Sequence, residues 1–283
     1  MPRRPAPAPP QASLFALPAA PFLKWAGGKR QLLDKILPHV PHRVRGYHEP
    51  FVGGGAVYFA VRATRDLKRA HLGDSNDRLV RTYRGLAANV DRVIDLLASY
   101  PHDRDFYEAL RARDPDGRPD AELAAWMIYL NRTGFNGLYR VNSKNIFNVP
   151  FGRYKNPRIC DAAGLRAVAS ALQGTELRTE HFSAVERRAE KGDFVYFDPP
   201  YVPVGKKSFV SYTDAGFGPG EHERLAETAR RLKQKGVKVL LSNADTPWVR
   251  ELYADFTLEE VLAARLVNSR SSGRGAVAEL LIH

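Results

Sequence analysis

Short apolar runs alternate with stretches of helical periodicity along most of the chain. The run FVYF at 194–197 is apolar at every position, which is typical of a strand buried on both faces, and VKVLLSN at 237–243 has the same character. Between these runs, 222–232 places its apolar residues on one face of a helix. Further strands are predicted at 72–74, 177–182, 256–262 and 276–282, and further helices at 162–173 and from Pro247. The pattern therefore predicts an α/β protein built on a central sheet.

An acid, two prolines and an aromatic residue directly follow the first of these runs: Asp198, Pro199, Pro200 and Tyr201. In open α/β sheets, ligands bind beyond the carboxyl ends of the strands, which is where this group falls. The prolines fix φ and have no N–H to donate, so the backbone here is stiff and its carbonyls are free. A carboxylate, a rigid carbonyl and a flat ring can together hold a planar amino group, such as the edge of a nucleobase. The alternative is a strand ended by a turn with an incidental acid.

The segment FLKWAGGKRQLLDKILPHV, which starts at Phe22, predicts a helix that begins at Gly27 and Gly28 and is stopped by Pro38. Lys29 falls in the first turn of this helix. A cation is unfavourable there unless it meets an anion, and the glycines permit a close approach, so the segment is suited to binding a carboxylate. An ordinary solvated lysine is the alternative.

A second glycine turn lies between a short strand and an apolar helix in YHEPFVGGGAVYFA, at 47–60. This order of elements is typical of a nucleotide pocket. The dinucleotide fingerprint fails, because its third glycine would fall at Tyr58, and a nicotinamide dehydrogenase is therefore disfavoured. Asp74 ends the next strand, where a ribose-binding carboxylate is expected. The alternative is that Asp74 caps the following helix, because 74–77 are all capping residue types.

The middle of the chain changes in character. Helical spacing dominates up to Leu130, and the stretch NRTGFNGLYRVNSKNIFNVPFGRYKNP follows from Asn131. A β-hairpin is predicted in this stretch, with strands at 138–141 and 146–149 joined by a turn at 142–145. A two-stranded ribbon fits the major groove of DNA, where Arg and Asn side chains pair with guanine and adenine. A polar surface loop is the alternative.

Composition favours a polyanionic partner and excludes several kinds of site. The 283-residue chain has 43 Lys and Arg against 31 Asp and Glu, a formal charge of +12, although a merely basic protein is the alternative. The single cysteine, Cys160, rules out an internal disulfide and a cysteine-based zinc site, and no metal ligands are assigned. No apolar run has the length of a membrane span and no signal-peptide core is found, so a cytoplasmic protein is expected.

Three basic or Pro-rich segments are expected to lie outside the folded core. Residues 1–21, rich in Pro and Ala, are predicted to be disordered. The loop that holds Lys206 and Lys207 is expected to close over an extruded base or its phosphates. The loop RLVNSRSSGRG, around Arg270, is either a phosphate clamp or a solvated basic loop.

In chain order, the segments FLKWAGGK, EPFVGGG, GDSN, NRTGFNGLYRVN, FNVPFGRYKNP and DPPY resemble the DNA adenine methyltransferase (Dam) family, which uses S-adenosylmethionine to methylate adenine N6. The similarity runs from Phe22 to the C-terminus. It implies a Rossmann-like methyltransferase sheet with an inserted, mainly helical target-recognition domain that carries a β-hairpin. The implied organisation is a disordered tail at 1–21, a catalytic domain at 22–76 and 161–283, and the target-recognition domain at 77–160.

The resemblance also implies roles for particular residues. The residues implied in catalysis are Asp198, Pro199, Pro200 and Tyr201. Those implied in cofactor binding are Trp25, Lys29, Glu49, Phe51, Gly53, Gly55, Asp74 and Asp198. Those implied in DNA binding are Lys24, Asn136, Leu138, Arg140 and Tyr154. Thr133 departs from the family, because other members often carry an aromatic residue there, and this leaves the fine sequence specificity open.

The predicted function is methyl transfer from S-adenosylmethionine to adenine N6 in duplex DNA, within GATC by resemblance. Cytosine-N4 transfer is one alternative, since the same groups can hold either amino group, and a non-catalytic basic DNA-binding protein with a vestigial nucleotide pocket is another. Cytosine-C5 transfer is rejected, because it needs a nucleophilic thiolate and Cys160 lies outside any strand-end motif. The expected partners are duplex DNA and, in a restriction system, a separately encoded endonuclease. The expected location is the bacterial nucleoid.

Overall fold

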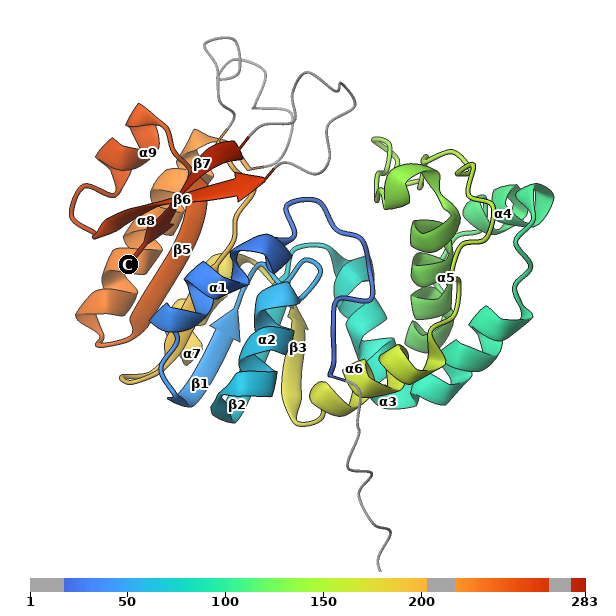
Figure 1. Cartoon of the computed structure of the whole chain (residues 1–283), viewed down its shortest axis with the longest axis horizontal. Helices are drawn as coiled ribbons and strands as arrows, with labels where there is room; N and C mark the ends of the chain where they lie inside the picture. The colour runs from blue at the N-terminus through green and yellow to red at the C-terminus, as the bar shows by residue number, and fades with distance from the viewer. Residues whose placement is uncertain (1–17, 203–216, 265–275) are drawn as a thin grey trace, which may run out of the picture.

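The computed structural model describes residues 18–202, 217–264 and 276–283 (Figure 1). Three predictions fall outside these residues: the disorder of most of the N-terminal tail, the base-covering loop with Lys206 and Lys207, and the phosphate clamp around Arg270. No helix within the described ranges is both long and apolar enough to cross a membrane.

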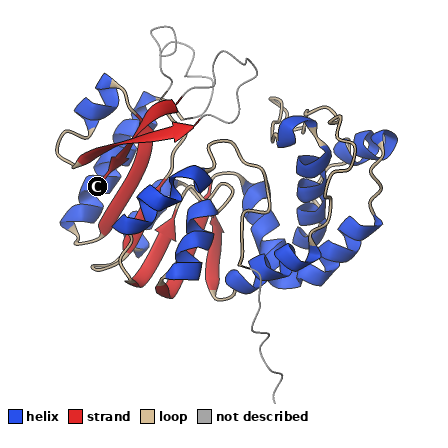
Figure 2. Cartoon of the chain, in the orientation of Figure 1, coloured by secondary structure: helices blue, strands red, loops and turns tan. Residues whose placement is uncertain are grey.

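Seven strands form one sheet in the described part of the chain, in the order β3-β2-β1-β4-β5-β7-β6 (Figure 2). The strands are β1 Arg43–Glu49, β2 Asp66–Asp74, β3 Thr175–Thr179, β4 Phe194–Phe197, β5 Lys238–Ala244, β6 Leu258–Ala264 and β7 Ala276–Ile282. β7 pairs antiparallel with β5 and β6, while the pairs among the other neighbouring strands are parallel. The carboxyl ends of β1, β2, β4 and β5 therefore meet at one edge of the sheet.

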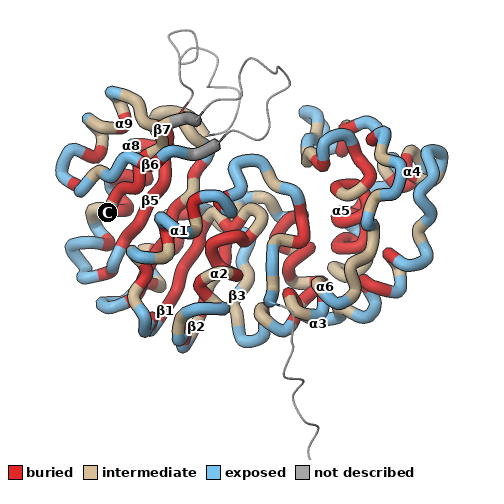
Figure 3. Tube along the Cα trace, viewed as in Figure 1, coloured by how far each residue is buried: buried red, intermediate tan, exposed pale blue. Residues whose placement is uncertain are grey.

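Helices cover both faces of this sheet. They are α1 Leu33–Ile36, α2 Ala56–Thr64, α3 Asp77–Ser99, α4 Arg104–Arg111, α5 Asp120–Thr133, α6 Ala162–Ala171, α7 Val185–Arg188, α8 Pro219–Gln234 and α9 Pro247–Leu252. Phe194 and Tyr196 of β4 pack in a hydrophobic cluster with residues of α2 and α3. Val195 and Phe197 pack in a second cluster with residues of α8 and α9. The prediction of a strand buried on both faces, and with it the Rossmann-like α/β class, is confirmed. Figure 3 shows buried positions along other strands of the sheet as well, such as β1 and β5.

Helices α3 to α6 form a unit beside β3, on the right in Figure 1. α3 and α5 cross closely, because a Cβ on Gly85 would lie 2.3 Å from the Asp120 carbonyl oxygen. Ion pairs of Arg78 with Asp116 and of Arg81 with Asp120 reinforce this contact. The helical spacing predicted for the middle of the chain is thus confirmed.

The helical unit is also attached to the sheet. The Arg84 guanidinium, on α3, donates hydrogen bonds of 3.1 and 2.9 Å to the Leu177 carbonyl of β3. α3 itself is kinked at Asn89, whose φ of −153° and ψ of 62° are not helical. α3 therefore contacts both α5 and the sheet, and its contacts do not mark a boundary between two domains. The limits 77–160 of an inserted domain stay a prediction.

The single helix predicted from Gly27 is wrong. The chain forms three short pieces, the 3-10 helix η1 Lys29–Leu32, α1 Leu33–Ile36 and the 3-10 helix η2 Leu37–His39. Leu32 has φ −105° and ψ 5°, which interrupts a regular α-helix, and Pro38 has no N–H to continue one. Lys29 is buried, so the alternative of a solvated lysine is also excluded.

The predicted β-hairpin is right in its turn and wrong in its strands. Within 138–149, a stretch that the structure describes fully, a single bridge joins Val141 to Phe147. The Asn142 side chain accepts two backbone N–H bonds inside the turn, both of 3.0 Å. The Val149 carbonyl accepts bonds of 2.9 and 3.0 Å from two side chains of α4. The two arms therefore pair only around this bridge, where the Asn142 N–H donates to the Ile146 carbonyl at 2.9 Å and the Asn148 N–H to the Arg140 carbonyl at 3.0 Å, and beyond it Val149 is held by the helical unit.

Candidate active site

The carboxylate of Asp198 follows β4 and is held from two sides. The Lys29 ammonium lies 2.8 Å from Oδ1, and the Ser242 hydroxyl, near the end of β5, donates to the same oxygen at 3.0 Å. Ser242 also shares a hydrogen bond of 3.0 Å with the Tyr196 hydroxyl. Both contacts to Asp198 reach Oδ1, which leaves Oδ2 without a hydrogen bond from the described residues. Oδ1 is thus fixed by both contacts.

Lys29 sets the electrostatics of this group. Burial raises the pKa of the Asp198 carboxyl, and Lys29 and Ser242 oppose the rise. The Lys29 side chain is only 6% exposed, donates to the Gly27 carbonyl at 2.6 Å, and lies 4.6 Å from the centroid of the Tyr201 ring. The buried ammonium therefore has an anion, a carbonyl and an aromatic face as neighbours, and it favours the ionised form of Asp198.

Tyr201 is anchored at its hydroxyl, which donates to Glu279 Oε2 on β7 at 2.7 Å. Between Asp198 and Tyr201, Pro199 is buried and Pro200 is exposed. Ser242 and Glu279 were not predicted from the sequence. Their only signal is a polar residue within an apolar run, and the sheet order that brings them to the site is not visible in the sequence.

The glycine turn after β1 packs against Trp25. Gly53 and Gly55 have φ values of 46° and 71°, which residues with a Cβ rarely adopt. A Cβ on Gly53 would lie 2.9 Å from Trp25 Cδ1. Asp74, at the end of β2, accepts the Gly53 N–H at 3.2 Å. Burial raises the pKa of Asp74, and the backbone N–H groups that donate to its carboxylate oppose this rise. Asn76, and not Asp74, caps α3, so the capping alternative for Asp74 is excluded.

Glu49 and Phe51 flank the same turn. Burial raises the pKa of Glu49 to about 8; the Tyr47 hydroxyl, which donates to Glu49 at 2.6 Å, opposes this rise and Asp198 adds to it. Glu49 is therefore mostly neutral at pH 7. Phe51 stacks on Phe182, with ring centroids 5.4 Å apart. The residues predicted to bind a cofactor thus gather around the carboxyl ends of β1, β2 and β4.

Lys24 and Tyr154, both predicted to contact DNA, lie together. Lys24 Nζ is 3.4 Å from the Tyr154 hydroxyl and 4.9 Å from the ring centroid. The buried Asn131 of α5 holds the backbone of Lys24, because its side chain accepts the Lys24 N–H at 2.8 Å and donates to the Lys24 carbonyl at 2.9 Å. Asn131 was not predicted to have this role, since 107 residues separate it from Lys24.

Asn136, Leu138 and Arg140 form a second group on the helical unit. Asn136 is exposed and has φ 55°, while Leu138 is half-buried against the core. Arg140 is exposed, and its guanidinium donates to the Asn148 side-chain oxygen at 2.7 Å and to the Asn148 carbonyl at 3.2 Å. Arg140 is therefore oriented by the turn that it precedes.

A stacked pair joins this second group to the glycine turn. The rings of Tyr139 and Trp25 are 5.5 Å apart between centroids, with an angle of 24° between their planes. Because Trp25 also packs on Gly53, the residues predicted for DNA and for the cofactor are linked through one aromatic contact.

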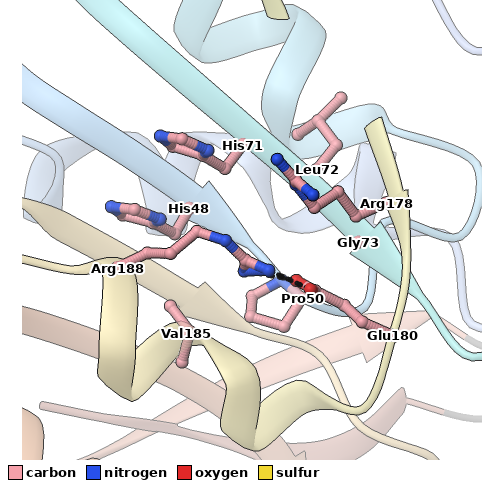
Figure 4. Close-up of a pocket in the computed structure, with 9 residues that line it drawn as sticks. All are labelled: His48, Pro50, His71, Leu72, Gly73, Arg178, Glu180, Val185 and Arg188. Atoms are coloured by element: carbon pink, nitrogen blue, oxygen red, sulfur yellow. Dashed lines mark hydrogen bonds and ion pairs between the residues drawn. The ribbon is translucent and has the colours of Figure 1, made fainter. Parts of the chain in front are cut away.

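A small pocket is lined by a different set of residues (Figure 4). Two stacked histidines, His48 and His71, line it together with Arg178, Glu180 and Arg188. Arg188 is already paired with Glu180. None of the residues predicted for catalysis, cofactor or DNA lines this pocket.

Comparison with known proteins assigns the chain to a family. Residues 25–266 match the family described as D12 class N6 adenine-specific DNA methyltransferase. A Type II methyltransferase of Lactococcus lactis subsp. cremoris is 41% identical over 271 residues, which cover 93% of this chain and 94% of that protein. A Type II methyltransferase of Methanocaldococcus jannaschii is 38% identical, with 93% and 98% covered. The DNA adenine methylase of Escherichia coli is 35% identical, with 92% and 93% covered. The chain therefore belongs to the D12 class of N6 adenine-specific DNA methyltransferases.

Proposed function

We propose that this adenine-specific DNA methyltransferase takes its methyl group from S-adenosylmethionine and methylates adenine N6 within the duplex sequence GATC. The observation that carries the proposal is the state of the Asp198 carboxylate. Its Oδ1 is held by Lys29 and Ser242, while Oδ2 has no hydrogen bond from the described residues. A partly buried, oriented acceptor of this kind suits the amino group of an extruded base.

Asp198 is the residue that we assign to the adenine amino group. Oδ2 and the Pro199 carbonyl accept its two N–H bonds, since an ionised carboxylate and a carbonyl are acceptors only. Accepting both bonds increases the electron density on N6, which is the attacking atom, and Asp198 can take the proton that N6 must lose. The Tyr201 ring stacks on the base and keeps its orientation through Glu279. Positioning and electrostatics then supply the rate.

The residues around the carboxyl ends of β1 and β2 fit an adenosine-containing cofactor. The glycine turn is packed too closely for side chains, because a Cβ on Gly53 would lie 2.9 Å from Trp25 Cδ1 and one on Gly55 would lie 2.6 Å from the Tyr83 hydroxyl. Asp74 offers a carboxylate suited to ribose hydroxyls, and Trp25 offers a flat ring beside the turn. When bound, S-adenosylmethionine supplies a methyl group activated by its sulfonium charge.

Recognition of the duplex is assigned to the two groups of side chains on and beside the helical unit. Arg140 is exposed and oriented, and a guanidinium in this state can pair bidentately with guanine, as Asn136 can with adenine. Lys24 and Tyr154 are assigned to the flanking base or backbone, and Leu138 to an apolar base contact. The formal charge of +12 supports attraction to phosphates. A separately encoded endonuclease acting on the same sequence is the further partner that we propose.

Methylated-base sequencing tests the proposal directly. The purified chain is incubated with S-adenosylmethionine and DNA of mixed sequence, with a reaction lacking the cofactor as the control. We expect N6-methyladenine in GATC on both strands, and none without the cofactor. Methylation at another sequence would overturn the assignment of GATC, and methylation that does not need added S-adenosylmethionine would overturn the donor.

Arg140→Ala tests the proposed guanine contact. Loss of a bidentate pair should weaken transition-state stabilisation on GATC by about 1–3 kcal/mol and slow its methylation accordingly. Methylation of a duplex changed at that guanine should slow much less. Arg153 is an exposed arginine of the same segment, and Arg153→Ala is the matched control. It should reduce methylation of all duplexes by the same factor. Equal losses on every duplex for Arg140→Ala would assign Arg140 to the phosphate backbone.

A further inference from the structure

Three side chains of metal-binding type meet at the edge of the sheet opposite to the candidate active site. They are His39 of η2, Glu259 of β6 and His283, which follows β7. One donor atom from each lies within 4.8 Å of the other two. His39 Nε2 is 3.1 Å from Glu259 Oε2, and the rings of His39 and His283 have centroids 4.6 Å apart.

The backbone under two of these donors is held in place. His283 and Thr257 exchange two backbone hydrogen bonds, of 2.9 and 3.0 Å, so the β6–β7 pairing extends to His283. The Arg65 guanidinium donates to the Leu37 carbonyl at 2.6 Å and to the Val40 carbonyl at 3.1 Å, which fixes η2 on both sides of His39. The donors are therefore brought together by the backbone contacts of the fold itself.

The chemistry of the donors selects among metals. Two imidazoles and one carboxylate are a common set for zinc, which takes four tetrahedral ligands and can keep a water as the fourth. Magnesium and calcium prefer oxygen ligands alone. Zinc–ligand bonds of about 2.0–2.1 Å need donors about 3.3 Å apart, so a spread of 4.8 Å closes by small side-chain rotations. The Glu259 side chain is 44% exposed and the His39 side chain is 20% exposed, which leaves room for these rotations.

We propose that His39, Glu259 and His283 bind one zinc ion. The ion would tie β6, the edge strand of the sheet, and the segment after β7 to η2, ten residues after Lys29. An edge strand held in this way is less available for pairing with another chain. The sequence gives no spacing motif for the site, because His39 and Glu259 are 220 positions apart.

Calorimetric titration of the full chain with zinc chloride tests the proposal. The protein carries no histidine tag and is first treated with a chelator, and magnesium chloride is titrated in parallel. We expect one zinc per chain, a rise in Tm with zinc, and no comparable rise with magnesium. The variants His39→Ala, Glu259→Gln and His283→Ala should each weaken zinc binding by at least about tenfold. His42→Ala, an exposed histidine three positions from His39, should bind zinc like the wild type.

Two results would overturn the proposal. One is the absence of stoichiometric zinc binding to the wild-type chain, which does not depend on how well any variant folds. The other is zinc binding that survives in all three ligand variants, since the zinc would then lie elsewhere. Neither readout uses methyl transfer, so the outcome is independent of the proposed function.

Discussion

Ser242→Ala removes one of the two contacts that hold Asp198 Oδ1. A hydrogen bond to a charged group contributes about 1.5–3 kcal/mol, and Lys29 still holds the same oxygen at 2.8 Å, so we expect the lower end of this range. About 1.4 kcal/mol corresponds to a tenfold change in rate, so methyl transfer should slow by about tenfold. The Ser242 hydroxyl also lowers the pKa of Asp198, so its loss should move the acid limb of the rate profile to higher pH.

Single-turnover transfer of a labelled methyl group, measured from pH 5.5 to 9, checks this expectation. Tyr196→Phe is the control, because it removes the other partner of Ser242 and leaves the bond to Asp198 in place. The Tyr196 variant should transfer at nearly the wild-type rate. If folded Ser242→Ala transferred at the wild-type rate with an unmoved acid limb, the reasoning that Ser242 positions Asp198 would be refuted.

Three further predictions concern binding and stability. Asp198→Ala should lose nearly all methyl transfer while duplex binding, measured by fluorescence anisotropy, survives, because phosphate contacts lie elsewhere. Glu49→Gln should change the dependence of stability on pH. The pKa of Glu49 in the folded chain is about 8, above the ordinary value of 4.5, so the wild type loses stability as the pH rises from 4.5 to 8 and the variant, which cannot ionise at this position, does not. In urea unfolding, the free energy of unfolding of the variant minus that of the wild type should therefore increase by about 1–3 kcal/mol between pH 5 and pH 8. Gly85→Ala should destabilise the chain by about 1–3 kcal/mol in the same assay, because its Cβ would meet the Asp120 carbonyl at 2.3 Å, whereas Gly117→Ala, with nothing within 4 Å, should have little effect.

Much of the sheet and the position of its chemistry follow from local patterns. An all-apolar run of four residues is typical of a strand buried on both faces, and the acid after such a strand falls at the carboxyl edge of the sheet. The same logic places Asp74 after β2 and the glycine turn after β1. In each case the informative signal lies within a few residues of the site.

The parts that could not be predicted depend on contacts between distant segments. Glu279 reaches Tyr201 only because β7 inserts between β5 and β6, and nothing in the local sequence specifies this order. The strands of the predicted hairpin are cut short by side-chain bonds: the Arg140 guanidinium takes the Asn148 carbonyl, and side chains of α4 hold the Val149 carbonyl. The raised pKa of Glu49 also arises from burial, which the sequence alone does not give.

The segment 22–29 connects the residues proposed for recognition to those proposed for chemistry. Lys24 is fixed to Asn131 of the helical unit by two backbone hydrogen bonds, of 2.8 and 2.9 Å. Five residues later, Lys29 is fixed to Asp198 at 2.8 Å. Between these two anchors the segment is a packed turn: the Gly28 N–H donates to the Trp25 carbonyl at 3.3 Å, and the Trp25 ring stacks on Tyr139 and lies against Gly53. On the proposed roles, contact of Lys24 with the duplex and the placement of the Asp198 carboxylate are therefore coupled through one short stretch of backbone.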